Sequence, residues 1–299
     1  MRHTKNHLSI LYLAVFLLSL NGLFSKIIPL DAVSVTQLRS VMAAITLLFF
    51  AYAGKRVCRL SGLKEYAGVY LVGVILGLHW ISFYHSMQIS TVAIGMLSLF
   101  TYPVITVFLE PLFNKQKIQF SDVVAAIMVF VGVVMMVGDD LNQFDSDSMQ
   151  GVFWGVISAF LFSIRNLLQK YNHSNVSSDG LILHQVIAIS IMLLLFVDIQ
   201  SVRSLEINDW LLLVVLGAIS TAAAHSLLSY SLKHLPAKSI AMISCLQPLA
   251  AAVFAWIILD EVPTKGIMAG GLIIISVAFY ESVHHVGLHR SKKIKENVN

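Results

Sequence analysis

The sequence predicts an all-α integral membrane protein in which ten transmembrane helices form two inverted five-helix repeats around a central cavity. Three observations favour this fold: the composition, the spacing of the apolar runs and an internal repeat. Hydrophobic residues make up 57% of the chain and charged residues 12%, with a mean hydropathy of +0.80. Soluble domains carry about 25% charged residues, so this balance is typical of a chain folded in hydrocarbon.

The apolar runs predict the transmembrane helices in order. A helix that crosses a bilayer needs about 20 mostly apolar residues. Ten segments satisfy this, near residues 8–28, 33–53, 66–87, 91–113, 120–138, 151–171, 180–197, 209–232, 237–259 and 265–285. The runs are continuous rather than alternating, which favours helices over membrane strands. The first run follows Arg2 and Lys5 as a signal peptide would, but it is long and lacks an A-x-A site, so we expect a retained helix.

The distribution of basic residues predicts the orientation. With the amino terminus in the cytoplasm, fifteen Lys and Arg residues fall in inside segments and three in outside segments, while Arg39 and Arg165 lie within spans. This is a strong positive-inside bias. We therefore expect a multi-pass protein of the bacterial inner membrane with both termini in the cytoplasm. Because the positive charge lies in short loops, nucleic acid is not an expected partner.

The two halves of the chain repeat each other about the midpoint. Tyr102-Pro103 and Gln247-Pro248 each interrupt a long apolar run, and the numbers 103 and 248 differ by 145. Five spans per half is an odd number, so the second half enters from the opposite side and the repeats are inverted. We predict a first repeat over 1–140, an acidic external linker over 141–150, a second repeat over 151–285 and a basic cytoplasmic tail over 286–299.

Several short motifs resemble the drug/metabolite transporter superfamily, in its ten-helix EamA-type branch. The motifs that carry the resemblance are Asn21 through Lys26 with Pro29 and Arg39, Ser90 to Ala93 with Tyr102-Pro103, Pro236-Ala237 with Gln247-Pro248, and the acidic turn Asp260 to Pro263. The resemblance covers nearly the whole chain. The first half departs from it at Lys115-Gln116-Lys117, which has no acid where the second half has the acidic turn.

The resemblance implies a secondary carrier of small metabolites, often an exporter, whose cavity opens alternately to each side. Amino acids and amphipathic drugs are suitable substrates, membrane lipid is the surrounding partner, and no cofactor is expected. The chain has no GxxxxGK[ST] phosphate loop. Two alternatives remain open: a flippase for a lipid-linked substrate, and a membrane-embedded enzyme. The sequence contains neither HExxH nor GxSxG, so we do not expect an enzyme.

The two intramembrane prolines are the first candidate site residues. Proline removes a backbone donor and clashes with the preceding turn, and a carbonyl freed inside the bilayer needs another partner. Tyr102-Pro103 and Gln247-Pro248 could therefore present backbone and side-chain groups to a substrate. The alternative is a fixed kink packed against neighbouring helices.

Polar and aromatic groups within the spans are the next candidates for the cavity wall. His79 could couple proton movement to substrate, or be a neutral histidine bonded to a helix carbonyl. Trp80 could stack on a substrate or simply pack, and Tyr84 shares its face. His225 lies 145 residues after Trp80, with Tyr230 following it.

Charged groups in or near the spans suggest binding, gating or proton coupling. Arg165, with Asn166 beside it, could bind a carboxylate or phosphate, snorkel to the headgroups or pair with a buried acid. Glu110 could carry a proton or form a gate ion pair with Arg165. For Arg39 and Lys26 we expect a gate or structural role nearer the outer surface. His285 and His289 form an i,i+4 pair without a third ligand, so no metal site is predicted.

Overall fold

The fold is helical throughout the part of the chain that the structure describes. The structure is a computed structural model and describes residues 2–55, 58–115, 117–137, 146–250, 253 and 265–296. Within those ranges there is no strand. The helices of the first half are α1 (Arg2–Leu18), α2 (Asn21–Ile27), α3 (Ala32–Ala53), α4 (Leu63–Ile89), α5 (Val92–Leu99), α6 (Tyr102–Asn114) and α7 (Phe120–Val137).

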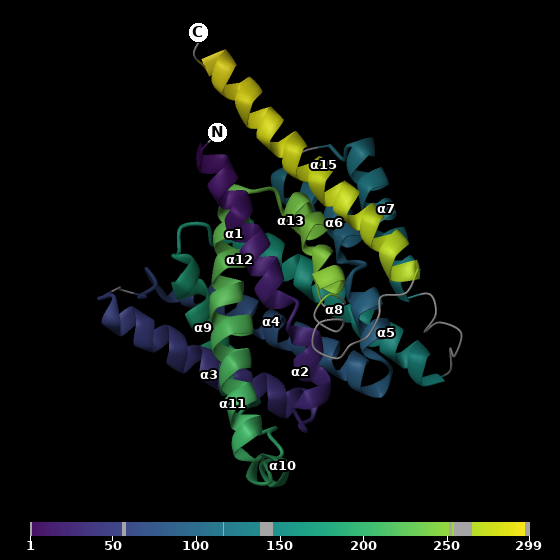
Figure 1. Cartoon of the computed structure of the whole chain (residues 1–299). Helices are drawn as coiled ribbons and strands as arrows, with labels where there is room; N and C mark the ends of the chain where they lie inside the picture. The colour runs from purple at the N-terminus through teal and green to yellow at the C-terminus, as the bar shows by residue number, and fades with distance from the viewer. Residues whose placement is uncertain are drawn as a thin grey trace.

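The second half contains a similar succession of helices (Figure 1). They are α8 (Ser146–Asn172), α9 (Ser178–Leu193), α10 (Ile199–Arg203), α11 (Ile207–Val215), the π-helix η2 (Leu216–Ala223), α12 (Ala224–His234), α13 (Ala237–Ser244) and α15 (Lys265–Glu296). Residues 246–250 are also helical.

Among the described residues, five helical segments are long and apolar enough to cross a membrane: Ala32–Ala53, Leu63–Ile89, Ile94–Asn114, Ser146–Asn172 and Ile207–His234. Shorter apolar helices occupy Asn6–Leu18, Phe120–Met135, Ser178–Leu193 and Met268–Tyr280. Each of these nine segments overlaps one of the predicted spans. The chain is therefore a multi-pass membrane protein, whereas the count of ten remains a prediction.

Local capping explains where several helices begin. The Asp31 carboxylate accepts hydrogen bonds from the backbone N–H groups of Val33 (2.8 Å) and Ser34 (3.2 Å) at the start of α3. The Thr91 hydroxyl accepts one from Ile94 N–H (3.1 Å) at the start of α5. Side-chain acceptors satisfy N–H groups that lack a partner in the first helical turn.

The predicted proline breaks coincide with helix boundaries. α5 ends at Leu99, and α6 begins with Tyr102-Pro103, so Pro103 lies in a first turn where its missing N–H costs little. The Thr101 hydroxyl donates to the Ser98 carbonyl (2.8 Å) at this break. In the second half, α13 ends at Ser244 and the helix that carries Gln247-Pro248 starts after it.

The π-helix η2 is a feature that the sequence analysis does not predict. Its extra width places the Thr221 hydroxyl to donate to the Leu216 carbonyl (2.7 Å), five residues earlier. Gly217 allows η2 to approach α3 closely, because a Cβ atom there would overlap Met42 and lie 3.1 Å from the Arg39 carbonyl oxygen. The close approach brings Thr221 next to Arg39.

Helix packing follows a paired pattern. α4 packs against α8, and α1 packs against α12. Adding 145 to the residue numbers takes α1 to α8, and it takes α4 to the continuous helix formed by α11, η2 and α12. The contact of α4 with α8 therefore corresponds to the contact of α12 with α1. The contacts α4 with α9 and α3 with η2 also correspond, while α3 with α9 and α7 with α15 each map onto themselves.

Candidate functional site

A narrow internal cavity of about 30 Å³ lies among the helices of both halves. Six of the residues predicted as site residues line it: Arg39, His79, Trp80, Tyr102, His225 and Gln247. They come from α3, α4, α6, α12 and the helical segment 246–250. A space of this size holds about one water-sized group, so the structure shows the cavity closed around its polar side chains.

Arg39 is the charged group of this cavity, although we predict it as a gate residue nearer the outer surface. Its side chain is 1% exposed. Nε donates to the Thr221 hydroxyl (3.0 Å), and Nη2 donates to Asn21 Oδ1 (3.0 Å). Its Cζ atom lies 4.3 Å from the centroid of the Trp80 ring. All these partners are neutral, so among the described residues no carboxylate balances the buried charge, which is costly in a low-dielectric interior.

Trp80 and Tyr84 from α4 and His225 from α12 complete one side of the cluster. The rings of Trp80 and His225 meet edge to face, with centroids 5.1 Å apart. The Tyr84 ring lies 5.5 Å from Arg39 Cζ. Tyr84 Oη and His225 Nδ1 are both buried without a hydrogen-bond partner. Buried polar atoms are nearly always paired in folded proteins. Because His225 lines the cavity and Tyr84 does not, His225 Nδ1 is the one of these two atoms that a ligand in the cavity could satisfy.

His79 lies on the other side of the cavity and is anchored to α8. Its Nδ1 atom is 2.7 Å from Ser158 Oγ and 3.1 Å from the Ser158 carbonyl oxygen. Its ring stacks on Phe162, with centroids 4.6 Å apart. His79 therefore contacts a helix carbonyl, as one of its two predicted roles requires, and it also lines the cavity.

Arg165 and Asn166 form a separate buried cluster outside the lining of the central cavity. Arg165 is fully buried. It donates to Asn166 Oδ1 (2.9 Å) and, from Nε and Nη2, to Gln185 Oε1 (3.2 and 2.6 Å). The two Arg165 alternatives, snorkelling and an ion pair with Glu110, are therefore wrong, because neutral side chains of α8 and α9 hold the guanidinium inside the protein.

The two buried arginine clusters are related through their asparagines. Asn21 and Asn166 are 145 residues apart, the spacing of the two prolines. Each Oδ1 atom accepts a hydrogen bond from a buried arginine, Arg39 in the first half and Arg165 in the second. Asn21 is not among the predicted site residues, and its spacing of 145 residues from Asn166 is the signal that could have identified it.

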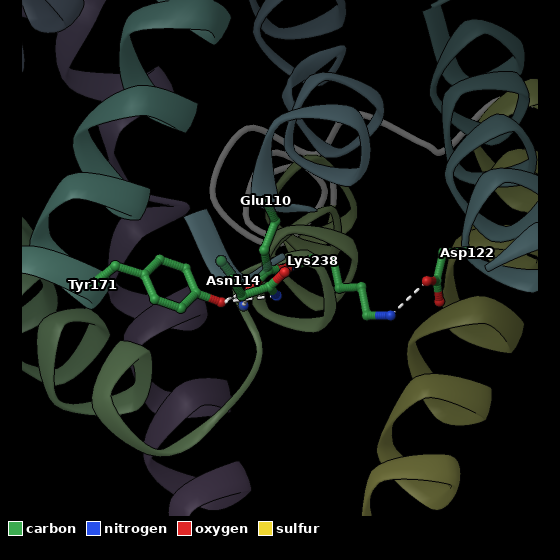
Figure 2. Close-up of polar contacts among 6 residues, drawn as sticks. Glu110, Asn114, Asp122, Tyr171 and Lys238 are labelled. Carbon is green, nitrogen blue, oxygen red and sulfur yellow. Dashed lines mark hydrogen bonds and ion pairs between the residues drawn. The ribbon is translucent and has the colours of Figure 1, made fainter. Parts of the chain in front are cut away.

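Glu110 lies at the start of α13 rather than beside Arg165 (Figure 2). Its carboxylate accepts the backbone N–H groups of Ala237 and Lys238 (both 2.9 Å) and the hydroxyl of Tyr171 (2.7 Å). Asn114 donates to the Tyr171 oxygen (3.2 Å). A carboxylate at a helix N-terminus is stabilised by the unpaired N–H groups and by the helix dipole.

The turn that joins α12 to α13 is held by charges of both signs. Lys170 of α8 donates to the carbonyls of Leu232 (2.8 Å) and Leu235 (2.5 Å) at the end of α12. Lys238 forms an ion pair with Asp122 of α7 (Figure 2). A cation at a helix C-terminus and an anion at the next helix N-terminus each complement the local dipole, so Lys170 and Glu110 together fix this turn against α6 and α8.

Three further predicted residues lie away from the cavity or beyond description. Tyr230 does not line the central cavity; it lies five residues after His225, which turns it to another face of α12, and its ring is 4.4 Å from that of His234. Lys26 belongs to α2, but its side chain is outside the described part of the chain. Pro248 lies in the helical segment 246–250.

A second, larger hollow of about 980 Å³ lies between α3, η2 and α12. Its lining is mostly apolar and includes Leu47, Phe50 and Leu227, with Tyr230, Lys233 and Asp179 among its polar residues. The Lys233 ammonium donates to the Val176 carbonyl. Sequence reasoning does not predict this hollow, because it depends on the gap between two helices that are far apart in the chain.

Side chains that could hold a metal are not grouped in the described ranges. No set of three or more His, Cys, Asp or Glu residues there could bind a metal ion. The side chains of His285 and His289 lie outside the described part, as does the acidic turn Asp260 to Pro263.

The similarity to known proteins concerns first the fold and then the family. A solved structure with a TM-score of 0.76 and 15% identity covers 92% of this chain and 95% of its own, and so shares the fold. The EamA-like transporter family matches residues 7–138 and 149–280, one match in each half. The chain belongs to the EamA-like transporter family.

Two relatives illustrate the range of this similarity. The chain is 24% identical to the uncharacterized transporter YxxF of Bacillus subtilis, over 78% of this chain and 75% of the relative. It is 23% identical to a protein of Rickettsia prowazekii named S-adenosylmethionine uptake transporter, over 88% of this chain and 87% of the relative.

Proposed function

We propose that this protein is a secondary-active transporter that exports small metabolites such as amino acids or amphipathic drugs by alternating access. The observation that carries the proposal is the central cavity, which residues of both halves line and whose lining includes a buried arginine and His225, with its unpaired Nδ1 atom. A closed cavity of this composition within a transporter fold suits a state between opening to one side and opening to the other.

Inverted repeats are part of the proposal, and the paired helix contacts support them. The contacts α4 with α8 and α1 with α12 correspond under the 145-residue shift, and α3 with α9 and α7 with α15 map onto themselves. A two-fold axis that exchanges the halves produces this pattern. With an odd number of spans per half, such an axis lies in the membrane plane.

The proposed orientation places the turn between α12 and α13 at the cytoplasmic face. Basic residues are concentrated in the segments assigned to this side, including Lys170, Lys233 and Lys238. Both termini then lie in the cytoplasm of a bacterial inner-membrane protein.

We assign the Glu110 cluster as the cytoplasmic gate. Glu110 of α6, Tyr171 of α8 and the N-terminus of α13 meet at one carboxylate. Moving α13 away from α6 breaks two charge-assisted hydrogen bonds, each worth about 1.5–3 kcal/mol. Protonation of Glu110 removes the negative charge that holds these bonds, which gives a route for proton coupling at the gate. His79 is the second proposed proton-coupling group.

Counterflow with the purified protein tests the transport function. Proteoliposomes loaded with an unlabelled metabolite should accumulate the same labelled metabolite faster than protein-free liposomes, and an imposed proton gradient should change the rate. Absence of exchange for every compound in an amino-acid and metabolite library would contradict transport, and exchange that ignores the proton gradient would contradict proton coupling.

The larger hollow supports a second candidate, the movement of a lipid-linked substrate. Its apolar lining suits an acyl chain, and Lys233 lies at its polar part. A fluorescent phospholipid analogue in proteoliposomes separates the two functions. Faster transfer of the analogue between leaflets than in protein-free vesicles would favour the flippase and count against a metabolite carrier.

A further inference from the structure

The charge balance of the central cavity identifies a substrate class. With the histidines counted as neutral, Arg39 is the single charged side chain among the described residues that line this cavity. Its guanidinium is 1% exposed and bonded only to neutral groups. Arg165, the other buried arginine, is held by Asn166 and Gln185 and does not line the cavity. The cavity therefore carries one positive charge for which the described residues supply no anion.

The unpaired polar atoms lie beside this charge. Arg39 and His225 both contact the Trp80 ring, and the Tyr84 ring lies 5.5 Å from Arg39 Cζ. Tyr84 Oη and His225 Nδ1 are buried and lack hydrogen-bond partners. Tyr84 is not in the lining of the cavity, whereas Arg39 and His225 both are. A protonated Nδ1 can donate a hydrogen bond, so one cation and one donor at the cavity wall fit an anion with oxygen acceptors.

We infer that the transported substrate carries a carboxylate, which binds Arg39 in the central cavity with His225 as an additional donor. This inference rests on the proposed transport function and narrows its substrates. A carboxylate fits better than a phosphate dianion, because Arg39 supplies a single positive charge and already uses Nε and Nη2 for Thr221 and Asn21. A planar monoanion can take the remaining guanidinium N–H groups. Amphipathic drugs without an acidic group are then not substrates.

Matched pairs of compounds test the inference by binding, independently of transport. The full chain in lipid nanodiscs is titrated with L-amino acids and 2-oxo acids, with their amides, and with phosphate monoesters, while the thermal-unfolding midpoint and tryptophan fluorescence are followed. We expect at least one carboxylate to bind about tenfold or more tightly than its amide. Equal binding of acid and amide, binding of phosphate monoesters alone, or no carboxylate binding at millimolar concentration would each overturn the inference.

Three variants locate the binding to Arg39. Arg39→Gln should weaken carboxylate binding about tenfold or more and leave amide binding unchanged, while Arg203→Gln, at an exposed arginine of α10, should change neither. His225→Phe removes a ring nitrogen that has no hydrogen-bond partner in the structure and keeps an aromatic ring beside Trp80, so it should fold normally and weaken carboxylate binding a few-fold. Carboxylate binding unchanged in His225→Phe and Arg39→Gln would exclude the site.

Counterflow with the same compounds separates this inference from the transport function. If acid and amide exchange at equal rates, transport stands and the carboxylate inference fails. If carboxylates bind through Arg39 but are not exchanged, the binding site stands and the proposed transport function fails.

Discussion

The hydroxyl of Tyr102 in α6 donates a hydrogen bond to the carbonyl of Ala241 in α13 at 2.9 Å. α6 begins just after the proline-associated break of the first repeat, and α13 ends just before that of the second, so this bond joins the two halves close to their interruptions. Tyr102 also lines the central cavity and packs edge to face on Phe162, with centroids 5.2 Å apart. The contact therefore links the meeting point of the repeats to the site.

Tyr102→Phe tests this link. The substitution leaves the Ala241 carbonyl without its cross-helix donor, and losing one buried hydrogen bond costs about 1–2 kcal/mol. We expect the free energy of unfolding in mild detergent, measured by denaturant titration, to fall by this amount. Tyr52→Phe, at a tyrosine that is 87% exposed, is the control and should change nothing. Equal stability of both variants and the natural chain would show that the contact is dispensable.

Trp80→Ala and Gln247→Ala test the cavity. Both side chains line it, so each variant should lower counterflow about tenfold, as a loss of about 1.4 kcal/mol of substrate interaction does. Membrane abundance should stay near that of the natural chain. Gln200→Ala, at an exposed position in α10, is the matched control for glutamine loss. Unchanged flux in both cavity variants would remove these residues from the site.

Glu110→Gln tests the cytoplasmic gate. A neutral amide replaces the charged acceptor of the Ala237 and Lys238 N–H groups, so the closed gate should lose about 1.5–3 kcal/mol. In a background with Cys58→Ser and Cys245→Ser, a cysteine at Gln247→Cys should then react faster with an impermeant maleimide applied from the cytoplasmic side. Asp147→Asn, an exposed acid at the other end of α8, is the control. Labelling that does not respond to Glu110→Gln would contradict the gate.

Much of the helical framework is predictable from the sequence because each helix depends on local signals. Continuous apolar runs predict the helices, and Pro103 and Pro248 predict where two of them break. Polar residues inside apolar runs, such as Arg39 and Trp80, are identifiable because they are costly in a membrane.

The partners of those residues are harder to predict because they come from distant parts of the chain. Glu110 caps a helix that begins at Ala237, and Arg39 bonds Thr221 only because η2 widens the helix there. Helical periodicity places Tyr230 away from His225, yet which face borders the cavity is decided by packing. The expected gate or structural role near the outer surface does not locate Arg39 in the cavity, because its position along α3 does not reveal that Trp80 and Asn21 contact it.

Gly217→Leu tests the packing that brings η2 to α3. A Cβ atom at this position would overlap Met42, and overpacking of a buried contact costs about 1–3 kcal/mol. We expect lower membrane abundance and, in purified protein, a lower thermal-unfolding midpoint. Gly62→Ala is the control, because a Cβ atom there meets nothing within 4 Å. Normal abundance and stability of Gly217→Leu would show that the helices can separate without cost.

Cysteine labelling from the two faces of the membrane tests the inverted-repeat architecture most directly. Single cysteines at Lys117→Cys, between α6 and α7, and at Asp147→Cys, in the first turn of α8, flank the fifth predicted span. We predict that an impermeant maleimide reaches the first only from the cytoplasm and the second only from outside. Labelling of both from the same face would contradict the opposed insertion of the two halves, and with it the cavity that they are proposed to share.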